Sequence, residues 1–374
     1  MFLNASRLDT WLPEAVFDYY AGLCAPLWTR RRVLARITAI HPETPTANTL
    51  VLQTNGHWKG CLPGQHVQLT VEINGVRHSR SYTPTFATAN TVHLTIKRIN
   101  TPTVAEHASA PGSATGSVSV SQWIHQQLTP GSIVELSQAF GTVVLPNPRP
   151  TSMVLIAGGS GMTPMLHILR TLAKEQSRSN IRLLQYAPTR DELLFSEELL
   201  QLQQQLPHYR STTALTQPTE PLENQEESMY LSGHFCDAHW DSLAIPAPDW
   251  ILVCGPSGLR RQVAAWAQNN HLDTRLHYEP VLPFSPPGGK TVQVTSARSE
   301  RQLQADTQLP LLQQAEAAGW NPTSGCRQGL CMSCHCKKLR GQVENLLTGQ
   351  LSDTAEEVIR LCVSRPVTDL HLDL

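Results

Sequence analysis

The chain is predicted to be a multidomain protein that combines an antiparallel β-barrel, a parallel α/β domain and a small α+β domain. Three patterns lead to this prediction. Short segments alternate apolar and polar residues, continuous apolar segments then alternate with helical stretches, and a Pro/Gly-rich linker precedes a last block of about 90 residues. A chain of 374 residues is too long for one ordinary core, so two or three domains are expected.

The antiparallel barrel is predicted over residues 33–147. The stretches TLVLQT, HVQLTVEI, VHLTIKRI and SIVELSQ alternate with period two, which is typical of strands that bury one face. Residues 1–32 precede the barrel as a leader that carries several aromatic side chains and ends in Arg30-Arg31-Arg32. We expect this leader to form a helix that packs on the barrel. The alternative is a docking surface for a membrane-bound partner, made of aromatics and arginines.

The parallel α/β domain is predicted over residues 148–283. The stretches MVLIAGG, IRLLQYA and WILVCG indicate buried strands, and helical stretches such as TPMLHILRTLAKE follow them. Strand–helix alternation of this kind indicates a parallel doubly wound sheet. The Pro/Gly linker PFSPPGGK then leads into the last domain, which is predicted over residues 284–374.

Composition limits the class of function. Lys and Arg total 29 against 30 Asp and Glu, a net charge of −1, which argues against nucleic-acid binding. The sequence has no apolar run of about 18 residues, so no membrane span is expected, and its start lacks the pattern of a secretory signal. An odd count of nine cysteines indicates reduced thiols and a cytoplasmic protein.

Four cysteines of the last domain lie in the stretch SGCRQGLCMSCHC. Cys326, Cys331 and Cys334 are spaced C-x4-C-x2-C, and Cys362 follows at a distance, which is the ligand pattern of plant-type [2Fe–2S] clusters. A structural zinc site, the alternative, more often uses two C-x2-C pairs. Gly325 and Gly329 are expected to give the loop the backbone freedom that a cluster requires.

The remaining cysteines outside these motifs are expected to pack as small apolar side chains. Cys336 begins a strand-like run whose period of two would turn it into the core. The same interpretation applies to Cys24, Cys61 and Cys236.

Residues 286–374, with SGCRQGLCMSC and LCVSRPV, resemble the fused ferredoxin domain of oxygenase and desaturase reductases. This resemblance implies a β-grasp fold. It also assigns Cys326, Cys331, Cys334 and Cys362 as the ligands of a [2Fe–2S] cluster.

The string Arg80-Ser81-Tyr82-Thr83, which follows PGQHVQLTVEI, resembles the R-x-Y-[ST] motif of the ferredoxin–NADP reductase superfamily. The resemblance implies that the arginine pairs with flavin phosphate, the tyrosine stacks on the isoalloxazine and the threonine hydroxyl bonds near flavin N5. These four residues are predicted to bind FAD, which is favoured over FMN, and Tyr82 and Thr83 are predicted to act in catalysis.

A second flavin contact is predicted where the chain enters the helical stretch QWIHQQL. Gly116-Ser117-Val118-Ser119 resembles the superfamily's phosphate-binding turn, in which amides at a helix N-terminus meet the anion. A plain helix N-cap is the alternative.

Two further strings resemble the superfamily's nicotinamide-nucleotide motifs. The strand MVLIAGG leads into a turn of the form G-G-x-G-[IM]-[TA]-P, whose glycines let the backbone approach a pyrophosphate. A later C-G-P segment implies a thiol close to the nicotinamide. The residues predicted to bind NAD(P)H are Gly158, Gly159, Gly161, Thr163, Pro164, Gly255 and Pro256, with Cys254 as a catalytic residue.

The choice between NADPH and NADH depends on the turn after IRLLQYA. Arg190 there could pair with a 2′-phosphate, whereas the neighbouring Asp191 would favour a free ribose hydroxyl. NADPH is preferred over NADH.

Together the motifs imply an NAD(P)H-dependent oxidoreductase that passes electrons through FAD and a [2Fe–2S] cluster to an oxygen-activating iron enzyme. The aromatic leader and the SRPV ending most resemble the reductases of fatty acyl desaturases, which implies peripheral contact at the inner face of the membrane. The first alternative is the reductase component of an aromatic-ring or alkane oxygenase. The second is a non-enzymatic, redox-sensing cluster protein.

Overall fold

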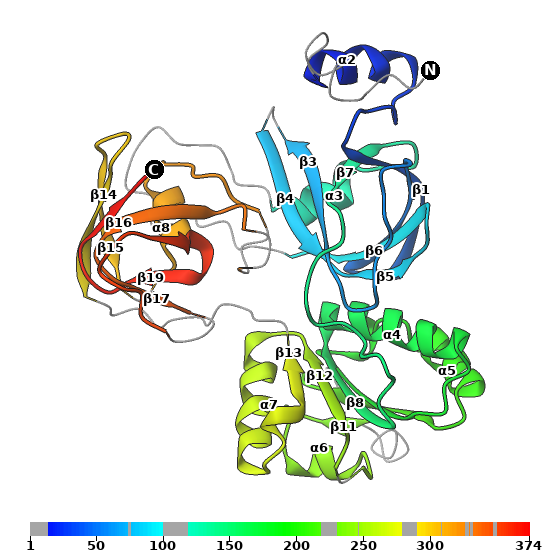
Figure 1. Cartoon of the computed structure of the whole chain (residues 1–374). Coiled ribbons are helices and arrows are strands. Elements are labelled where there is room, and N and C mark those ends of the chain that lie inside the picture. Colours follow the sequence, from blue (N-terminus) through cyan, green and yellow to red (C-terminus); the bar gives the residue numbers. More distant parts are fainter. Residues whose placement is uncertain are drawn as a thin grey trace. The chain divides into compact units, whose positions relative to one another are not determined.

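The chain divides into two compact units, Met1–His277 and Tyr278–Leu374 (Figure 1). The first unit contains the predicted barrel and α/β domain, and the second contains the last domain. The structure is a computed structural model that describes residues 14–73, 76–99, 119–217, 230–245, 247–278, 290–307, 309–325, 329, 332–346 and 350–374.

Seven antiparallel strands form the first sheet, in the order β4-β3-β7-β1-β2-β6-β5. Val67, Leu69 and Val71 of β3 are buried in one core, as their period of two predicts. Helix α3 (Val120–Gln127) adds Ile124 to the same core. The predicted antiparallel barrel is confirmed. Its strands are β1 (Val33–Thr44), β2 (Ala47–Thr54), β3 (Val67–Ile73), β4 (Val76–Tyr82), β5 (Pro84–Ala87), β6 (Thr91–Lys97) and β7 (Ile133–Leu136).

The second sheet of the first unit has the strand order β11-β10-β9-β8-β12-β13. The neighbouring strands from β11 to β12 in this order all pair in parallel. The predicted doubly wound α/β domain is therefore confirmed. Its strands are β8 (Ser152–Gly158), β9 (Asn180–Ala187), β10 (Tyr209–Leu215), β11 (Leu231–Ser232), β12 (Trp250–Cys254) and β13 (Leu276–Tyr278). Its helices are α4 (Met162–Lys174), α5 (Ser196–Gln205), α6 (Asp237–Asp241) and α7 (Ser257–Asn269), with short 3₁₀ turns η1 (Gly159–Gly161), η2 (Arg190–Glu192) and η3 (Asp273–Arg275).

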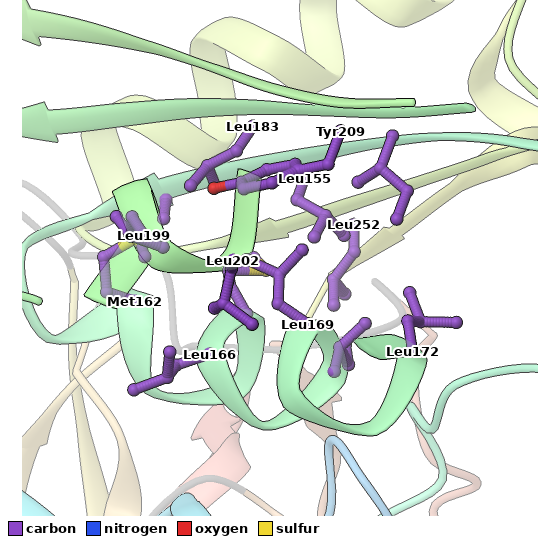
Figure 2. Close-up of a cluster of buried hydrophobic side chains, with 14 of the residues drawn as sticks. Leu155, Met162, Leu166, Leu169, Leu172, Leu183, Leu199, Leu202, Tyr209 and Leu252 are labelled. Atoms are coloured by element: carbon purple, nitrogen blue, oxygen red, sulfur yellow. The ribbon is translucent and has the colours of Figure 1, made fainter. Parts of the chain in front are cut away.

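Both faces of this sheet are buried, which is why its strands are continuously apolar. On β8, Leu155 belongs to the core under α4 and α5, whereas Ile156 belongs to the core that includes α7. Figure 2 shows the first of these cores, in which Leu169 of α4 lies beside Leu202 of α5, between the helices and the sheet.

Helix α4 joins the two domains of the first unit through strand β5. Arg170 of α4 donates Nη1 to the Thr85 backbone oxygen at 2.9 Å, and Glu198 of α5 holds its guanidinium through two bonds of 2.6 and 2.7 Å. A two-point arginine–carboxylate pair fixes the direction of the guanidinium as well as its position. We call the contact of Arg170 and His167 with β5 the α4–β5 clamp.

Glu192 makes a second connection between the two domains. The carboxylate lies in η2 of the α/β domain and accepts a hydrogen bond from Thr46 Oγ1 at 2.8 Å. It also pairs with Lys97 Nζ at 2.6 Å. Both partners belong to the barrel, so the turn after β9 is held against it.

The second unit has a mixed five-stranded sheet in the order β15-β14-β20-β16-β18, with β14 and β20 parallel. Lys338 of β16 is fully buried, and its Nζ donates to the backbone oxygens of Asp353 at 2.8 Å and Ala355 at 2.5 Å. A mixed sheet with one helix agrees with the predicted β-grasp. The elements are β14 (Thr291–Ser296), β15 (Gln302–Asp306), α8 (Leu311–Ala317), β16 (His335–Arg340), β17 (Val343–Asn345), β18 (Glu357–Arg360), η4 (Leu361–Val363), β19 (Ser364–Pro366) and β20 (Leu370–Leu372).

The leader contains the expected helix, α2 (Glu14–Cys24), but no described residue of this helix belongs to the core of the barrel on which it was expected to pack. The chain after it is tied to the barrel because Asn55 Nδ2 donates to the Leu27 oxygen at 3.2 Å and to the Arg32 oxygen at 2.9 Å. No helix in the described part of the chain is long and apolar enough to cross a bilayer.

The expectation that the spare cysteines are packed in cores is wrong for two of them. Cys24 ends α2 and Cys236 precedes α6, and both are exposed because helix ends lie at the surface. Cys61 is half-buried. Cys336 is 4% exposed and belongs to the core of the second unit, as predicted.

His167 of the α4–β5 clamp gives a test of this arrangement. Burial lowers its pKa to about 4, the charge of Arg170 acts in the same direction, and a hydrogen bond to the Pro84 backbone opposes both. In the unfolded chain the His167 imidazole takes up a proton near pH 6.5, whereas in the folded protein it stays neutral until about pH 4. The free energy of unfolding therefore falls as the pH falls from 6.5 towards 4.

Between pH 6.5 and 4, the loss of unfolding free energy measured in urea should be smaller by about 3 kcal/mol in His167→Gln than in the parent protein. His93, His239 and His277 also have lowered pKa values because of burial, so part of the slope remains. An unchanged slope in the folded variant would contradict the burial of a neutral His167.

Candidate cofactor and cluster sites

Strand β4 carries the first three residues of the predicted flavin motif. Arg80 lies opposite Leu69 of β3, and Tyr82 lies opposite Val67. Arg80 and Tyr82 share one face because strand residues two apart point the same way. Burial raises the pKa of Tyr82 to about 12, which the charge of Arg80 opposes. The ring therefore stays neutral and apolar at physiological pH, as stacking requires.

Ser81 and Gln68 lie opposite each other on the other face of β4 and β3. In the described part of the chain, the Ser81 hydroxyl and Gln68 Nε2 are both buried without a hydrogen-bond partner. Buried polar atoms normally have partners. Two such atoms, one of them within the predicted motif, fit contact with a polar ligand on this face of the sheet.

Thr83, the fourth residue of the motif, has a partner that the sequence analysis missed. Its Oγ1 lies 2.7 Å from Nδ1 of His66, and both side chains are buried. Phe140 holds the His66 ring from its edge, with ring centres 6.0 Å apart. His66 therefore fixes the direction of the Thr83 hydroxyl. The position of His66 directly after the Pro63-Gly64-Gln65 turn, one strand before the motif, could have indicated this role from the sequence.

The predicted phosphate turn lies mostly outside the described residues, which exclude Gly116, Ser117 and Val118. Ser119 occupies the N-cap position of α3, but its hydroxyl contacts Ser121 Oγ at 2.9 Å and makes no capping hydrogen bond. The N-cap alternative therefore has no side-chain bond to support it. The assignment to flavin phosphate stays a proposal.

The predicted nucleotide turns meet at the carboxyl ends of β8 and β12. These strands pair in parallel with Ala157 opposite Cys254. From β8 the sheet continues to β9 and β10 on one side and to β12 on the other. Doubly wound sheets bind ligands at such a switch point.

The two turns are packed backbone against backbone. A Cβ on Gly161 would lie 2.1 Å from the Cys254 oxygen, and a Cβ on Gly158 would lie 2.8 Å from Pro256 Cδ. Gly255 has a φ of +146°, and its Cβ would meet Gly158 N at 2.8 Å. Only glycine fits these three positions. These glycines therefore let the two turns pack in direct contact at the edge where the nucleotide is predicted to bind.

Gly159, Thr163 and Pro164 complete the turn at the start of α4. Gly159 has a φ of +54°, and Thr163 Oγ1 donates to the Ser160 oxygen at 3.1 Å. Pro164 lies in the first helical turn, where its missing amide costs no hydrogen bond. The predicted nucleotide residues of β8, α4 and β12 thus lie together at one sheet edge.

Arg190 lies in η2, after the carboxyl end of β9. Its guanidinium carbon is 5.2 Å from the ring centre of Tyr230. Stacking on an aromatic face leaves the edge of a guanidinium able to bind a phosphate. Tyr230 was missed because it enters from a distant part of the sequence.

Cys334 and Cys362 are the predicted cluster ligands within the described residues, and Cys326 and Cys331 lie outside them. Cys334 is 3% exposed and Cys362 is 1% exposed. Leu361 N donates to the Cys334 oxygen at 3.0 Å, which holds the two segments side by side. Two buried thiols from adjoining segments fit the donor set of a [2Fe–2S] cluster.

Gly329 and Arg360 support one of these thiols. Gly329 N donates to Cys362 Sγ at 3.2 Å, and its φ of +75° agrees with the freedom expected of this glycine. Arg360 Nη1 donates to the Gly329 oxygen. Hydrogen bonds to ligand sulfurs help to set the potential of a cluster. Sequence analysis missed Arg360 because its partner lies in a different segment.

Three protein families match successive parts of the chain. An oxidoreductase FAD-binding domain matches residues 34–144, and an oxidoreductase NAD-binding domain matches residues 155–265. A 2Fe-2S iron-sulfur cluster binding domain matches residues 294–367. The order of these matches is the order of the three domains described above.

Similar proteins span most of the chain. An NADPH oxidoreductase of Mycobacterium tuberculosis is 29% identical, covering 96% of this chain and 88% of its own. The 3-chlorobenzoate-3,4-dioxygenase reductase subunit of Comamonas testosteroni is 27% identical over 83% of this chain and 87% of its own. The solved structure of phthalate dioxygenase reductase superposes with a TM-score of 0.55 at 21% identity, covering 91% of this chain and 97% of that one.

Arg190 gives a test of nucleotide choice. If its guanidinium binds a 2′-phosphate, removing the charge-assisted bonds in Arg190→Ala should raise the KM for NADPH about 10-fold or more. The KM for NADH, which has no 2′-phosphate, should change little. The exposed Arg210 of β10 supplies the control Arg210→Ala. Equal effects on both nucleotides would contradict this role.

Arg360 gives a test of the cluster environment. Arg360→Gln removes a positive charge and frees the carbonyl of Gly329, so the midpoint potential of the cluster should fall by roughly 30–60 mV, up to a tenfold change in the one-electron equilibrium. Arg340→Gln removes the same charge from an exposed position of the same sheet and should shift the potential much less. Equal shifts, measured by redox titration of the visible spectrum, would contradict the role of the Arg360–Gly329 bond.

Proposed function

We propose that this protein delivers electrons from NADPH to the oxygen-activating component of an oxygenase. The chain is an FAD- and NAD-binding reductase of the ferredoxin–NADP reductase type with a C-terminal [2Fe–2S] ferredoxin domain. The observation that carries this proposal is the similarity of 83% of the chain to a dioxygenase reductase subunit. The preference for NADPH is supported by the contact of Arg190 with Tyr230 and by the name of the mycobacterial relative.

The cofactors supply the electron chemistry: a nicotinamide gives a hydride, a flavin takes it and releases electrons singly, and a [2Fe–2S] cluster carries one electron at a time. The chain supplies positions for them. We assign Arg80 and Tyr82 to the flavin, with Thr83 oriented by His66 towards the reacting edge. The glycine turns of β8 and β12 receive the nucleotide, and Cys254 ends β12 at the same edge.

The fatty acyl desaturase, which the sequence analysis placed first as the client, becomes the second candidate. The relatives named above with a stated client are reductases of dioxygenases. One observation still favours a membrane-bound acceptor, namely the exposed aromatic side chains of α2. The interpretation as a non-enzymatic redox sensor is wrong, because the chain is an NAD(P)H oxidoreductase of the ferredoxin reductase type.

The client is identified by coupled turnover. Purified reductase is combined with NADPH and either a Rieske-type ring-hydroxylating oxygenase or a membrane fraction that contains a fatty acyl desaturase, and product is measured together with NADPH consumed. Product from the oxygenase, matched to NADPH consumed, supports the proposal. Product from the desaturase alone would overturn the choice of client and leave the reductase activity in place.

Separate domains for flavin and cluster predict separable activities. Cys331→Ser should abolish the cluster's visible absorbance and lower cytochrome c reduction at least about 100-fold, because single electrons then lose their carrier. Ferricyanide reduction, which the flavin supports, should persist. Cys336→Ser changes a buried cysteine two residues from Cys334 and serves as the control, which should keep both activities. Loss of both activities in a folded Cys331→Ser protein would contradict the scheme.

A further inference from the structure

Helix α2 presents an apolar face to solvent. Val16, Tyr19, Tyr20 and Leu23 are 39%, 65%, 63% and 69% exposed. Their spacing of i, i+3, i+4 and i+7 puts all four on one side of the helix. Trp28, which follows the helix, is 63% exposed. Other exposed apolar side chains, such as Leu200 of α5, occur singly, as they do on most proteins.

The opposite side of α2 is held by polar contacts. Asp18 is 8% exposed and accepts hydrogen bonds from Arg30 N at 2.8 Å and Arg32 Nε at 2.9 Å. The ring of Phe17 lies under the guanidinium of Arg30, 5.2 Å from ring centre to carbon. A surface helix normally turns its apolar face inward and its charged face outward. Helix α2 has the reverse orientation, fixed by an ion pair.

The composition of this face indicates what covers it. Tyrosine and tryptophan, with an apolar ring and a polar tip, are the side chains enriched at the interface between bilayer and water. Residues 14–36 contain four arginines and two acidic residues, so this segment has a net charge of +2, whereas the whole chain has a net charge of −1. Arg31 is exposed beside these aromatics in the sequence. The segment therefore matches an anionic surface in charge as well as in polarity.

We propose that α2 and Trp28 dock the reductase on an anionic lipid surface, with the helix in the plane of the interface. Val16 and Leu23 enter the acyl boundary, Tyr19, Tyr20 and Trp28 lie at the level of the headgroups, and Arg31 meets lipid phosphates. The barrel stays attached through the Asn55 bonds to Leu27 and Arg32. This inference is independent of which enzyme accepts the electrons.

The test uses the full-length holoenzyme and two kinds of vesicle, one of equal parts phosphatidylglycerol and phosphatidylcholine and one of phosphatidylcholine alone. Cosedimentation with the anionic vesicles, weakened by added salt, is expected. The double variant Tyr19→Ser/Tyr20→Ser should bind about 10-fold less, because apolar area and charge act together in interfacial binding. Arg31→Glu should weaken binding to anionic vesicles only.

Leu200→Ser removes an equally exposed leucine from α5 and should bind as the parent protein does. All variants should keep NADPH–ferricyanide activity, because none of the changed residues belongs to the cofactor sites. Absence of binding to anionic vesicles, or equal binding by the double tyrosine variant, would overturn the proposal. So would a dimer in sedimentation velocity that the double variant dissociates, since a second copy would then be the occupant of this face.

Discussion

In the proposed arrangement, the distance between the flavin and the nicotinamide depends on the contact of α4 with β5. Strand β5 begins two residues after Tyr82, and α4 begins directly after the glycine turn. The segments that would hold the flavin and the nucleotide are therefore the same ones that Arg170 connects. Hydride transfer requires reacting atoms about 3–3.5 Å apart, so a small shift at this contact would separate the cofactors. Glu192 adds a second connection between the two domains, through Thr46 and Lys97 of the barrel.

Close backbone packing serves the same constraint within the α/β domain. The contact of Gly161 with the Cys254 oxygen brings the end of β12 against the start of α4. A side chain at this glycine would push the predicted thiol away from the turn that is proposed to receive the pyrophosphate. The turn and Cys254 are thus one rigid object, built on two neighbouring strands of the sheet. The second unit has its own sheet and core, so its sulfur ligands do not rely on this packing.

The sequence predicted what depends on local pattern, and failed where distant residues meet. Alternation identified β2, β3, β6 and β7 of the first sheet, continuous apolar runs identified β8, β9 and β12 of the second, and glycine spacing identified the turns. His66, Tyr230 and Arg360 were missed because each acts through a partner far away in the chain, and no period or motif records such pairs. Cys24 and Cys236 were misplaced because hydrophobic character alone does not tell a core position from a helix end.

The ferredoxin unit uses two buried or half-buried cations to control backbone rather than to make ion pairs. Lys338 Nζ donates hydrogen bonds to the backbone oxygens of Asp353 and Ala355, and these bonds hold the loop before β18 in place. Arg360, at the end of β18, then reaches the Gly329 oxygen, and Gly329 in turn donates to Cys362 Sγ. The positive charge of Arg360 is thereby held beside the glycine that donates to Cys362 Sγ. A nearby positive charge and a hydrogen bond to sulfur would both favour the reduced state of a cluster held by this thiol.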